Sequence, residues 1–148
     1  MLERIIKASE DFRKFEEKVG RGDLAKTIML ISKDSDYSFE FAKLLSCLIF
    51  GGQESHDKVV SGAHPDLKIY PLKDRLYVAD SQEIVFESAV KPIFANKKVF
   101  IIRDIDKGME QAQNKLLKTL EEPESNVYFI LTTTLQGRDY FSLVRGAG

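Results

Sequence analysis

The sequence is short of the residues that several classes of protein require. Its single cysteine, Cys47, cannot form an internal disulfide or a multi-thiolate metal site, and this usage is typical of a reducing cytoplasm. No apolar run approaches the roughly 20 residues that a membrane-spanning helix needs. The N-terminus alternates charged and apolar residues, which is not the pattern of a secretory signal. We therefore expect a globular cytoplasmic protein without a membrane segment.

An excess of positive charge is also missing. The 148 residues carry 22 basic and 23 acidic side chains, which gives a net charge of −1. A protein that binds nucleic acid alone usually has a basic surplus, because the phosphate backbone attracts cations. The balance argues against a stand-alone DNA-binding module. It leaves open contact with DNA as one subunit of a larger assembly.

The hydrophobic pattern predicts an α/β fold in one domain. Helical periodicity is present over residues 2–19, 37–50 and 109–120, and Asp80 with Glu83 forms a capping-box pattern for a helix that ends near Lys91. The polar stretch 51–63 is predicted to be a loop. Short apolar runs rich in β-branched residues predict four strands buried on both faces, at 27–31, 67–70, 99–102 and 127–131.

Strands that alternate with helices indicate a parallel sheet covered on both faces. In such sheets, binding sites form at the carboxyl ends of the strands. The segments to search are therefore Ser32–Glu40, Tyr70–Arg75, Arg103–Asp106 and Thr132–Gln136.

Four blocks of sequence occur in a specific order. Gly62–Asp66 reads Gly-Ala-His-Pro-Asp before a strand, and Val99–Asp106 is a strand followed by acidic residues. Asn114–Pro123 reads Asn-Lys-Leu-Leu-Lys-Thr-Leu-Glu-Glu-Pro, and Phe129–Thr134 is a strand that ends in threonines. Together they resemble the AAA+ family of bacterial DNA polymerase III clamp-loader subunits, of the delta-prime kind. The resemblance implies a P-loop NTPase-type parallel sheet flanked by helices, as a single N-terminal domain over residues 1–148 that lacks the family's lid and collar domains.

The stretch after the first strand lacks what a phosphate-binding loop needs. Such a loop uses glycines so that backbone N–H groups converge on the phosphates, a lysine for the β- and γ-phosphates and a Ser or Thr for Mg²⁺. Placed on the family pattern, Lys33 and Ser38 take the glycine positions, Phe39 the lysine position and Glu40 the Ser/Thr position. The acidic residues in this stretch would repel a polyanion. We expect a degenerate site that binds no nucleotide cofactor.

The acidic motif after the third strand also lacks the residues that an active nucleotide site needs. Active relatives place an Asp that supports Mg²⁺ and then a Glu that polarises the attacking water. Arg103 and Asp104 stand at these two positions, and a cation opposes Mg²⁺. We expect Asp104 and Asp106 to form a helix N-cap pair or an ion pair with Arg103.

Two further positions of the family pattern concern phosphate contacts. Thr133, or its neighbour Thr134, matches the sensor position that touches the γ-phosphate in active relatives. With no phosphate expected, we predict a turn or a strand-end hydrogen bond there. Arg145 lies about one position from the arginine-finger position and lacks the flanking residues, so we assign it no finger role.

The zinc module that many clamp-loader subunits carry is also absent from the pattern. Tetrahedral thiolate zinc needs four ligands. From the end of the second helix pattern to Gly62, the candidate ligands are only Cys47 in that helix and His56 after it, with Glu54 and Asp57 nearby. We expect no metal site, and Cys47 is interpreted as a small core residue.

Basic residues form clusters around the end of the second strand, before the third strand and on one face of the last helix. We interpret them as solvated surface charge, with DNA contact inside an assembly as the alternative. They are Lys68, Lys73 and Arg75, then Lys97 and Lys98, and then Lys115 and Lys118.

The resemblance implies an architectural function. The chain is expected to be a non-hydrolysing member of the ring that loads the sliding clamp during DNA replication, and not an enzyme by itself. Its expected partners are the gamma/tau-like ATPase subunits and the delta-like subunit, while the sliding clamp and primer-template DNA are contacted only within the assembly. One alternative is an active ATPase with an atypical phosphate loop. Another is a receiver-like phosphoacceptor domain that uses Asp104, Asp106 and a strand-end threonine around Mg²⁺.

Overall fold

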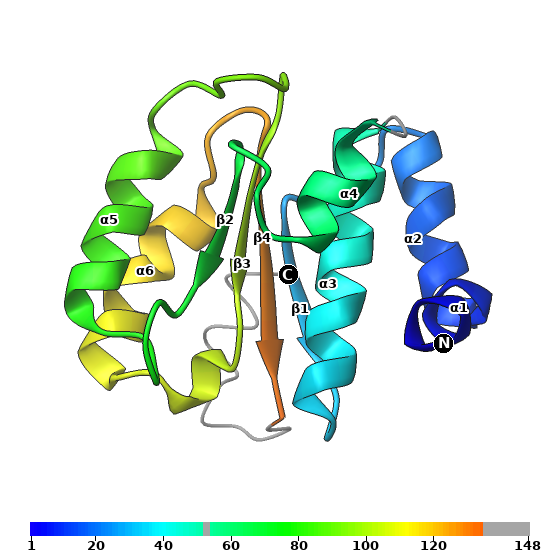
Figure 1. Ribbon diagram of the computed structural model, residues 1–148. Coiled ribbons are helices and arrows are strands. Elements are labelled where there is room, and N and C mark those ends of the chain that lie inside the picture. The colour runs from blue at the N-terminus through cyan, green and yellow to red at the C-terminus, as the bar shows by residue number, and fades with distance from the viewer. Residues whose placement is uncertain (52–53, 135–148) are drawn as a thin grey trace.

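The four predicted strands form one parallel sheet (Figure 1). The structure is a computed structural model, and it describes residues 1–51 and 54–134. The strands are β1 Thr27–Ile31, β2 Leu67–Tyr70, β3 Lys98–Ile102 and β4 Val127–Thr133, in the spatial order β1-β4-β3-β2. The predicted α/β class and the parallel sheet are confirmed.

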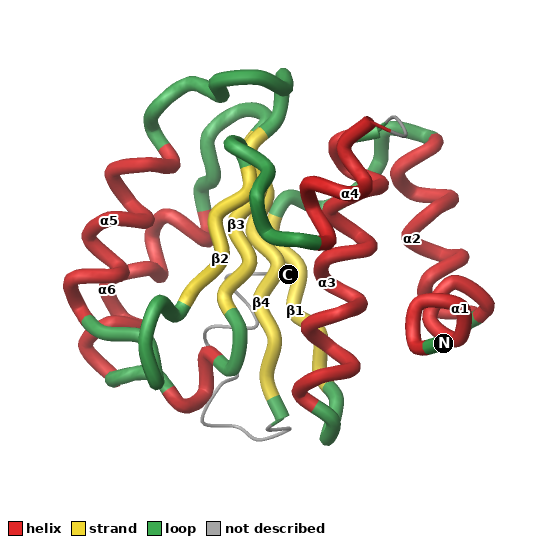
Figure 2. Tube along the Cα trace, viewed as in Figure 1, coloured by secondary structure: helices red, strands yellow, loops and turns green. Residues whose placement is uncertain are grey.

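Helices cover both faces of this sheet (Figure 2). Helices α5 (Val78–Ser88) and α6 (Glu110–Glu121) lie on one face, and α3 (Ser35–Phe50) and α4 (Glu54–Val60) lie on the other. Helices α1 (Leu2–Ala8) and α2 (Glu10–Gly20) pack outside α3, and a short 3₁₀ helix, η1 (Ile105–Lys107), follows β3. Within the described ranges, no helix has both the length and the apolar character needed to span a membrane.

Strand β3 shows why the sheet is buried on both sides. All five of its residues are buried, and alternate side chains point to opposite faces. Phe100 and Ile102 join a cluster with residues of α5 and α6, which we call the α5/α6 cluster. Val99 and Ile101 join a second cluster with residues of α3 and α4, the α3/α4 cluster. A continuous apolar run is therefore the expected sequence for a strand in this position.

Lys98 is a correction to the interpretation of the basic pairs as surface charge. Its side chain is only 2% exposed, and its ammonium donates to the carbonyls of Glu87 and Val90 at 2.8 and 2.9 Å. Burial lowers the pKa of Lys98, against the opposing effect of the Glu87 carboxylate. The ammonium therefore binds carbonyls at and just after the C-terminal end of α5, where a positive charge is favourable.

The Gly62–Asp66 block has a structural role. His64 is 2% exposed and stacks on Phe50 with ring centres 4.0 Å apart, and its Nδ1 accepts the N–H of Asp66. The Asp66 carboxylate is fully buried and accepts three backbone N–H groups of the segment between α5 and β3. These donors belong to Ile93, Phe94 and Ala95, at 2.6 to 2.8 Å.

Three of the predicted helical and loop segments differ from the structure. The single helix over 2–19 is two helices, because Ser9 leaves the helical conformation and its hydroxyl accepts the N–H of Phe12 to cap α2. The predicted loop 51–63 contains α4, of which only Val59 is fully buried among the side chains described. Helix α5 begins two residues before Asp80, whose carboxylate accepts the N–H of Tyr77 at 2.8 Å.

Candidate functional site at the carboxyl edge of the sheet

The segment after β1 turns into helix earlier than a phosphate-binding loop would. Only three residues connect β1 to α3, and Ser35 already begins the helix. The carboxylate of Asp34 caps α3 by accepting the N–H of Tyr37 at 3.1 Å, and the carbonyl of Asp34 accepts the N–H of Ser38 at 3.1 Å. The first-turn N–H groups of Tyr37 and Ser38 are therefore bonded within the chain. An acidic side chain lies where an anion would approach the helix.

The remaining phosphate-loop positions are spread over the helix surface. Lys33 is exposed, and Ser38 is buried. Two cations lie over the ring of Phe39, with the Arg103 guanidinium 4.7 Å and the Lys43 ammonium 4.8 Å from its centre. Glu40 pairs with Lys43 at 2.9 Å. The four predicted residues thus share a helix start without converging on one point.

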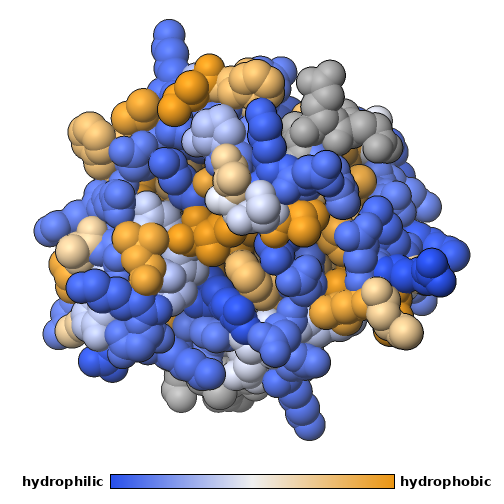
Figure 3. Space-filling model, in the orientation of Figure 1, coloured by the Kyte–Doolittle hydropathy of each residue, from blue (hydrophilic) through white to orange (hydrophobic). Residues whose placement is uncertain are grey.

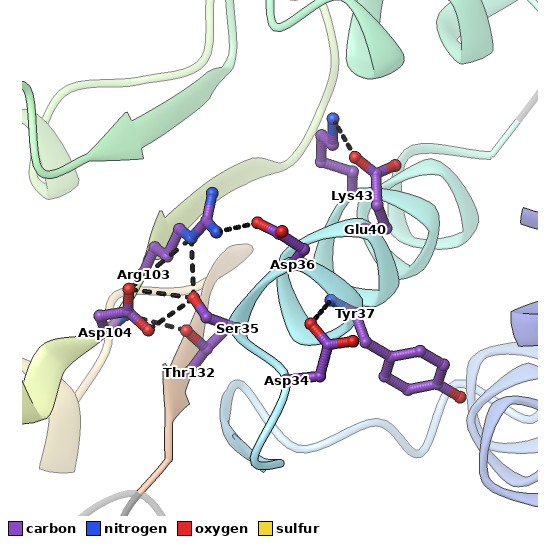
Figure 4. A network of polar contacts seen from close by, with 9 residues as sticks. All are labelled: Asp34, Ser35, Asp36, Tyr37, Glu40, Lys43, Arg103, Asp104 and Thr132. Carbon is purple, nitrogen blue, oxygen red and sulfur yellow. Dashed lines mark hydrogen bonds and ion pairs between the residues drawn. The ribbon is translucent and has the colours of Figure 1, made fainter. Parts of the chain in front are cut away.

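The side chain of Arg103, directly after β3, extends to the N-terminal end of α3 (Figure 4). Its Nε donates to the Ser35 hydroxyl at 3.0 Å, and a terminal nitrogen pairs with the Asp36 carboxylate. The same Nε lies 3.7 Å from Asp104, so the expected ion pair between these neighbours is present. The Ser35 hydroxyl in turn donates to both oxygens of Asp104, at 2.8 and 3.0 Å. The network joins α3 to the end of β3.

Asp104 also contacts β4. Its backbone has a left-handed conformation with φ of 53°, which Asp adopts more readily than most residues. Its N–H donates to the Thr132 hydroxyl at 2.9 Å. Asp104 occupies the N-cap position of η1 but makes no side-chain cap, so the predicted N-cap pair with Asp106 does not form.

The threonines at the end of β4 have separate roles. Thr133 is buried in the strand, and its carbonyl accepts the N–H of Ser32 at 3.1 Å. Thr134 lies 3.4 Å from a carboxylate oxygen of Asp106. The predicted strand-end hydrogen bonds are present, but Ser35 and Thr132 were not singled out from the sequence. Arg145 lies outside the described residues.

A cavity of about 310 Å³ adjoins this network on the β2 side. Its lining includes Lys73, Arg75 and Arg103 together with Asp74 and Asp104. The Asp74 carboxylate accepts a hydrogen bond from the Tyr77 hydroxyl, and that bond lowers the pKa of the Asp74 carboxyl. The cavity therefore brings charges of both signs together beside the carboxyl ends of β2 and β3.

Cys47 and His56 line a different groove, between the N-terminal helices and α3. Burial raises the pKa of Cys47 to about 11, which leaves the thiol protonated near neutral pH. His56 lies 3.6 Å from Glu3. Among the described residues, no group of three or more His, Cys, Asp or Glu side chains is close enough together to hold a metal ion.

The comparison with known proteins agrees with the fold and with the family resemblance. A family model described as DNA polymerase III, delta subunit, matches residues 7–138. The chain belongs to this family. Subunit delta′ of DNA polymerase III from Bacillus subtilis is 30% identical over 125 residues, which cover 80% of this chain and 35% of that protein. Subunit tau/gamma from Haemophilus influenzae is 33% identical over 100 residues, which cover 64% of this chain and 14% of that protein.

This member of the DNA polymerase III delta-subunit family shares its fold with a solved protein. The crystal structure of a gamma subunit-related protein from Thermotoga maritima superposes with a TM-score of 0.65 over 93% of this chain and 43% of that chain, at 19% identity. At that identity the likeness concerns the fold alone, and it agrees with the predicted parallel sheet flanked by helices. The chain spans only about a third or less of the curated relatives, so the activities of the whole proteins are not transferred to it.

Proposed function

We propose that this chain is a non-hydrolysing, delta-prime-like clamp-loader subunit of DNA polymerase III, with a structural part in loading the sliding clamp. The observation that carries the proposal is the start of α3. Nucleotide phosphates bind where N–H groups at a helix N-terminus are free to converge on them. Here the Asp34 carboxylate bonds the N–H of Tyr37, and the helix has already begun at Ser35.

The charges at the carboxyl edge support the same proposal. Position 39, where the family pattern has a lysine, holds Phe39, and two cations lie over its ring. At the position that would support Mg²⁺, the cationic Arg103 pairs with Asp36 and Asp104. A metal–triphosphate complex would have to displace these pairs and tolerate the Asp34 carboxylate. The family assignment removes the receiver-like alternative, so the remaining competitor is an ATPase with an atypical loop.

Calorimetric titration with ATP and Mg²⁺ tests this proposal. We expect no saturable heat at protein concentrations that detect a dissociation constant of about 1 mM, or about −4 kcal/mol. The matched control restores the loop pattern with Lys33→Gly, Ser38→Gly, Phe39→Lys and Glu40→Thr. Any binding gained by this variant shows that the assay detects an occupied site. Micromolar binding by the wild-type chain would overturn the proposal in favour of the atypical ATPase.

The proposed partners are the gamma/tau-like and delta-like subunits in the cytoplasm, with the sliding clamp and primer-template DNA contacted only in the assembly. An exposed apolar patch favours a partner-binding role. It runs along the top of the molecule in Figure 3, over the segment between α5 and β3. Its residues are Phe86, Val90, Ile93 and Phe94, which are 68%, 42%, 79% and 63% exposed. Exposed apolar patches on soluble proteins often mark contact surfaces.

Co-purification with the partner subunits tests the patch. The double variant Ile93→Ser/Phe94→Ser is expected to weaken association about tenfold or more, because apolar anchors dominate interface energies. Leu72→Ser is the control, since Leu72 is 65% exposed but lies after β2, at the opposite edge of the sheet. Equal association of the double variant and the wild type would exclude this surface.

A further inference from the structure

The cationic side chain at the carboxyl edge is satisfied by the chain itself. Arg103 is flanked by the carboxylates of Asp36 and Asp104 and donates to the Ser35 hydroxyl (Figure 4). Its guanidinium also lies 4.7 Å from the centre of the Phe39 ring. The backbone N–H of Arg103 donates to the carbonyl of Tyr70 at 2.8 Å. The guanidinium thus contacts charged, polar and aromatic groups at once. A planar cation with five donors is suited to such a position.

We infer that Arg103 is a built-in counter-ion that holds the carboxyl edge of the sheet together without a bound ligand. This inference rests on the proposed function, in which no metal–nucleotide complex occupies the edge. Arg103 and the Ser35–Asp104 hydrogen bonds join α3 to β3, and the Asp104 N–H extends the connection to Thr132 on β4. Arg103 is a positioning residue in this sense, because it fixes the spacing of three elements.

The carboxylates of Asp36 and Asp104 contribute unequally to the binding of the Arg103 guanidinium. The Asp36 side chain is 85% exposed, and solvent screens an ion pair at that position strongly. The Asp104 side chain is only 20% exposed, so its carboxylate is shielded from water. The partner that depends on Arg103 is therefore Asp104. Neutral Arg103 variants leave this carboxylate with the Ser35 hydroxyl and without its cation.

A hard divalent cation is the natural replacement for the missing charge. Carboxylate and hydroxyl oxygens are ligands that Mg²⁺ and Mn²⁺ accept. With the guanidinium removed, Asp36 and Asp104 would present oxygens to the vacated position from two sides. In the wild-type chain, the Arg103 guanidinium fills this position.

Thermal unfolding with Mn²⁺ alone, at constant ionic strength, tests the inference. We expect the midpoint of Arg103→Gln to lie below that of the wild type and to rise saturably by about 3 °C with Mn²⁺. The double variant Arg103→Gln/Asp104→Asn should lose the Mn²⁺ response, and Asn tolerates the left-handed backbone at this position. Lys43→Gln is the matched control, because the Lys43 ammonium also lies over the Phe39 ring but pairs with Glu40. Its midpoint should not respond to Mn²⁺.

The outcomes separate this inference from the proposed function. The inference is overturned if Arg103→Gln does not respond to Mn²⁺, or if the wild type responds equally. It is also overturned if Arg103→Gln and Asp104→Asn lower the midpoint additively, since coupled partners must deviate from additivity. The ATP titration of the wild-type chain decides the proposed function independently. No ATP binding combined with no Mn²⁺ response defeats only the role of Arg103.

Discussion

Two buried charges in this chain hold backbone segments instead of a ligand. Lys98 bonds the carbonyls at the end of α5, and Asp66 bonds the N–H groups of the segment that follows that helix. Burial alone would raise the pKa of Asp66, but the three N–H donors outweigh it and lower the pKa below its ordinary value. The carboxylate is therefore more stable in the folded chain than its burial suggests.

Replacing Asp66 should destabilise the fold strongly. We expect Asp66→Ala to lower the free energy of unfolding by about 3 kcal/mol, because hydrogen bonds to a charged group are lost and their donors are left in a partly buried segment. Urea denaturation measures this change. Asp57→Ala, in which the lost side chain is fully exposed, should change the free energy by less than about 0.5 kcal/mol. A value for Asp66→Ala as small as that of the control would contradict the anchoring role.

His64 should make the stability fall in mild acid. Burial lowers its pKa and the charge of Lys58 adds to this effect, while Asp66 acts in the opposite direction. The stability that depends on neutral His64 is thus complete above the unfolded pKa of about 6.5 and is lost as the pH falls toward the lower folded pKa. We expect a loss of up to about 1.4 kcal/mol per pH unit in urea denaturation below about pH 6.5. His64→Phe, which keeps a ring beside Phe50, should flatten this dependence, and an unchanged slope would refute the assignment.

At the scale of the element, α3 depends on its N-cap. Asp34→Ala removes the acceptor for the Tyr37 N–H and should lower the free energy of unfolding by about 1 kcal/mol. Asp34→Asn should stay close to the wild type, because Asn caps helices about as well as Asp. Lys33→Ala changes an exposed neighbour and serves as the control. Chemical denaturation measures the free energy of unfolding of the three variants, and Asp34→Ala should show the largest loss. Equal effects of Asp34→Ala and Asp34→Asn would disprove the cap.

The sequence predicted the strands better than the short helices. Strands β1 and β2 have the predicted bounds because buried parallel strands are short continuous apolar runs. Helix α4 was missed because its seven residues carry too few apolar side chains to produce a helical period. The break at Ser9 was missed because the apolar spacing continues across it, although Ser9 before Glu10 and Asp11 is an N-cap signal.

The candidate site was predicted in position but not in its contacts. The order of the strands in the sheet brings the segments after β1, β3 and β4 to one edge, as the α/β pattern predicted. The bond between Ser35 and Asp104 joins residues 69 positions apart. Such a contact follows from the packing of α3 on the sheet, and no local spacing announces it. The buried role of Lys98 was missed because its partners are the backbone carbonyls of Glu87 and Val90, at and just after the end of α5, and no side-chain pattern marks such carbonyls.

At the scale of the molecule, the two faces of the sheet should unfold together. Ile101 lies in the α3/α4 cluster and Ile102 in the α5/α6 cluster, and both are fully buried in the same strand. Ile101→Val and Ile102→Val remove one methylene each from opposite faces, at a cost of about 1 kcal/mol per variant. We expect each to shift a single unfolding transition by about 3 °C, with far-UV circular dichroism and tyrosine fluorescence coincident. Tyr70 packs in the α5/α6 cluster and Tyr128 against the α3/α4 cluster, so fluorescence reports on both faces. Separate transitions for the two variants would mean that the faces are independent folding units, which a strand shared by both clusters does not allow.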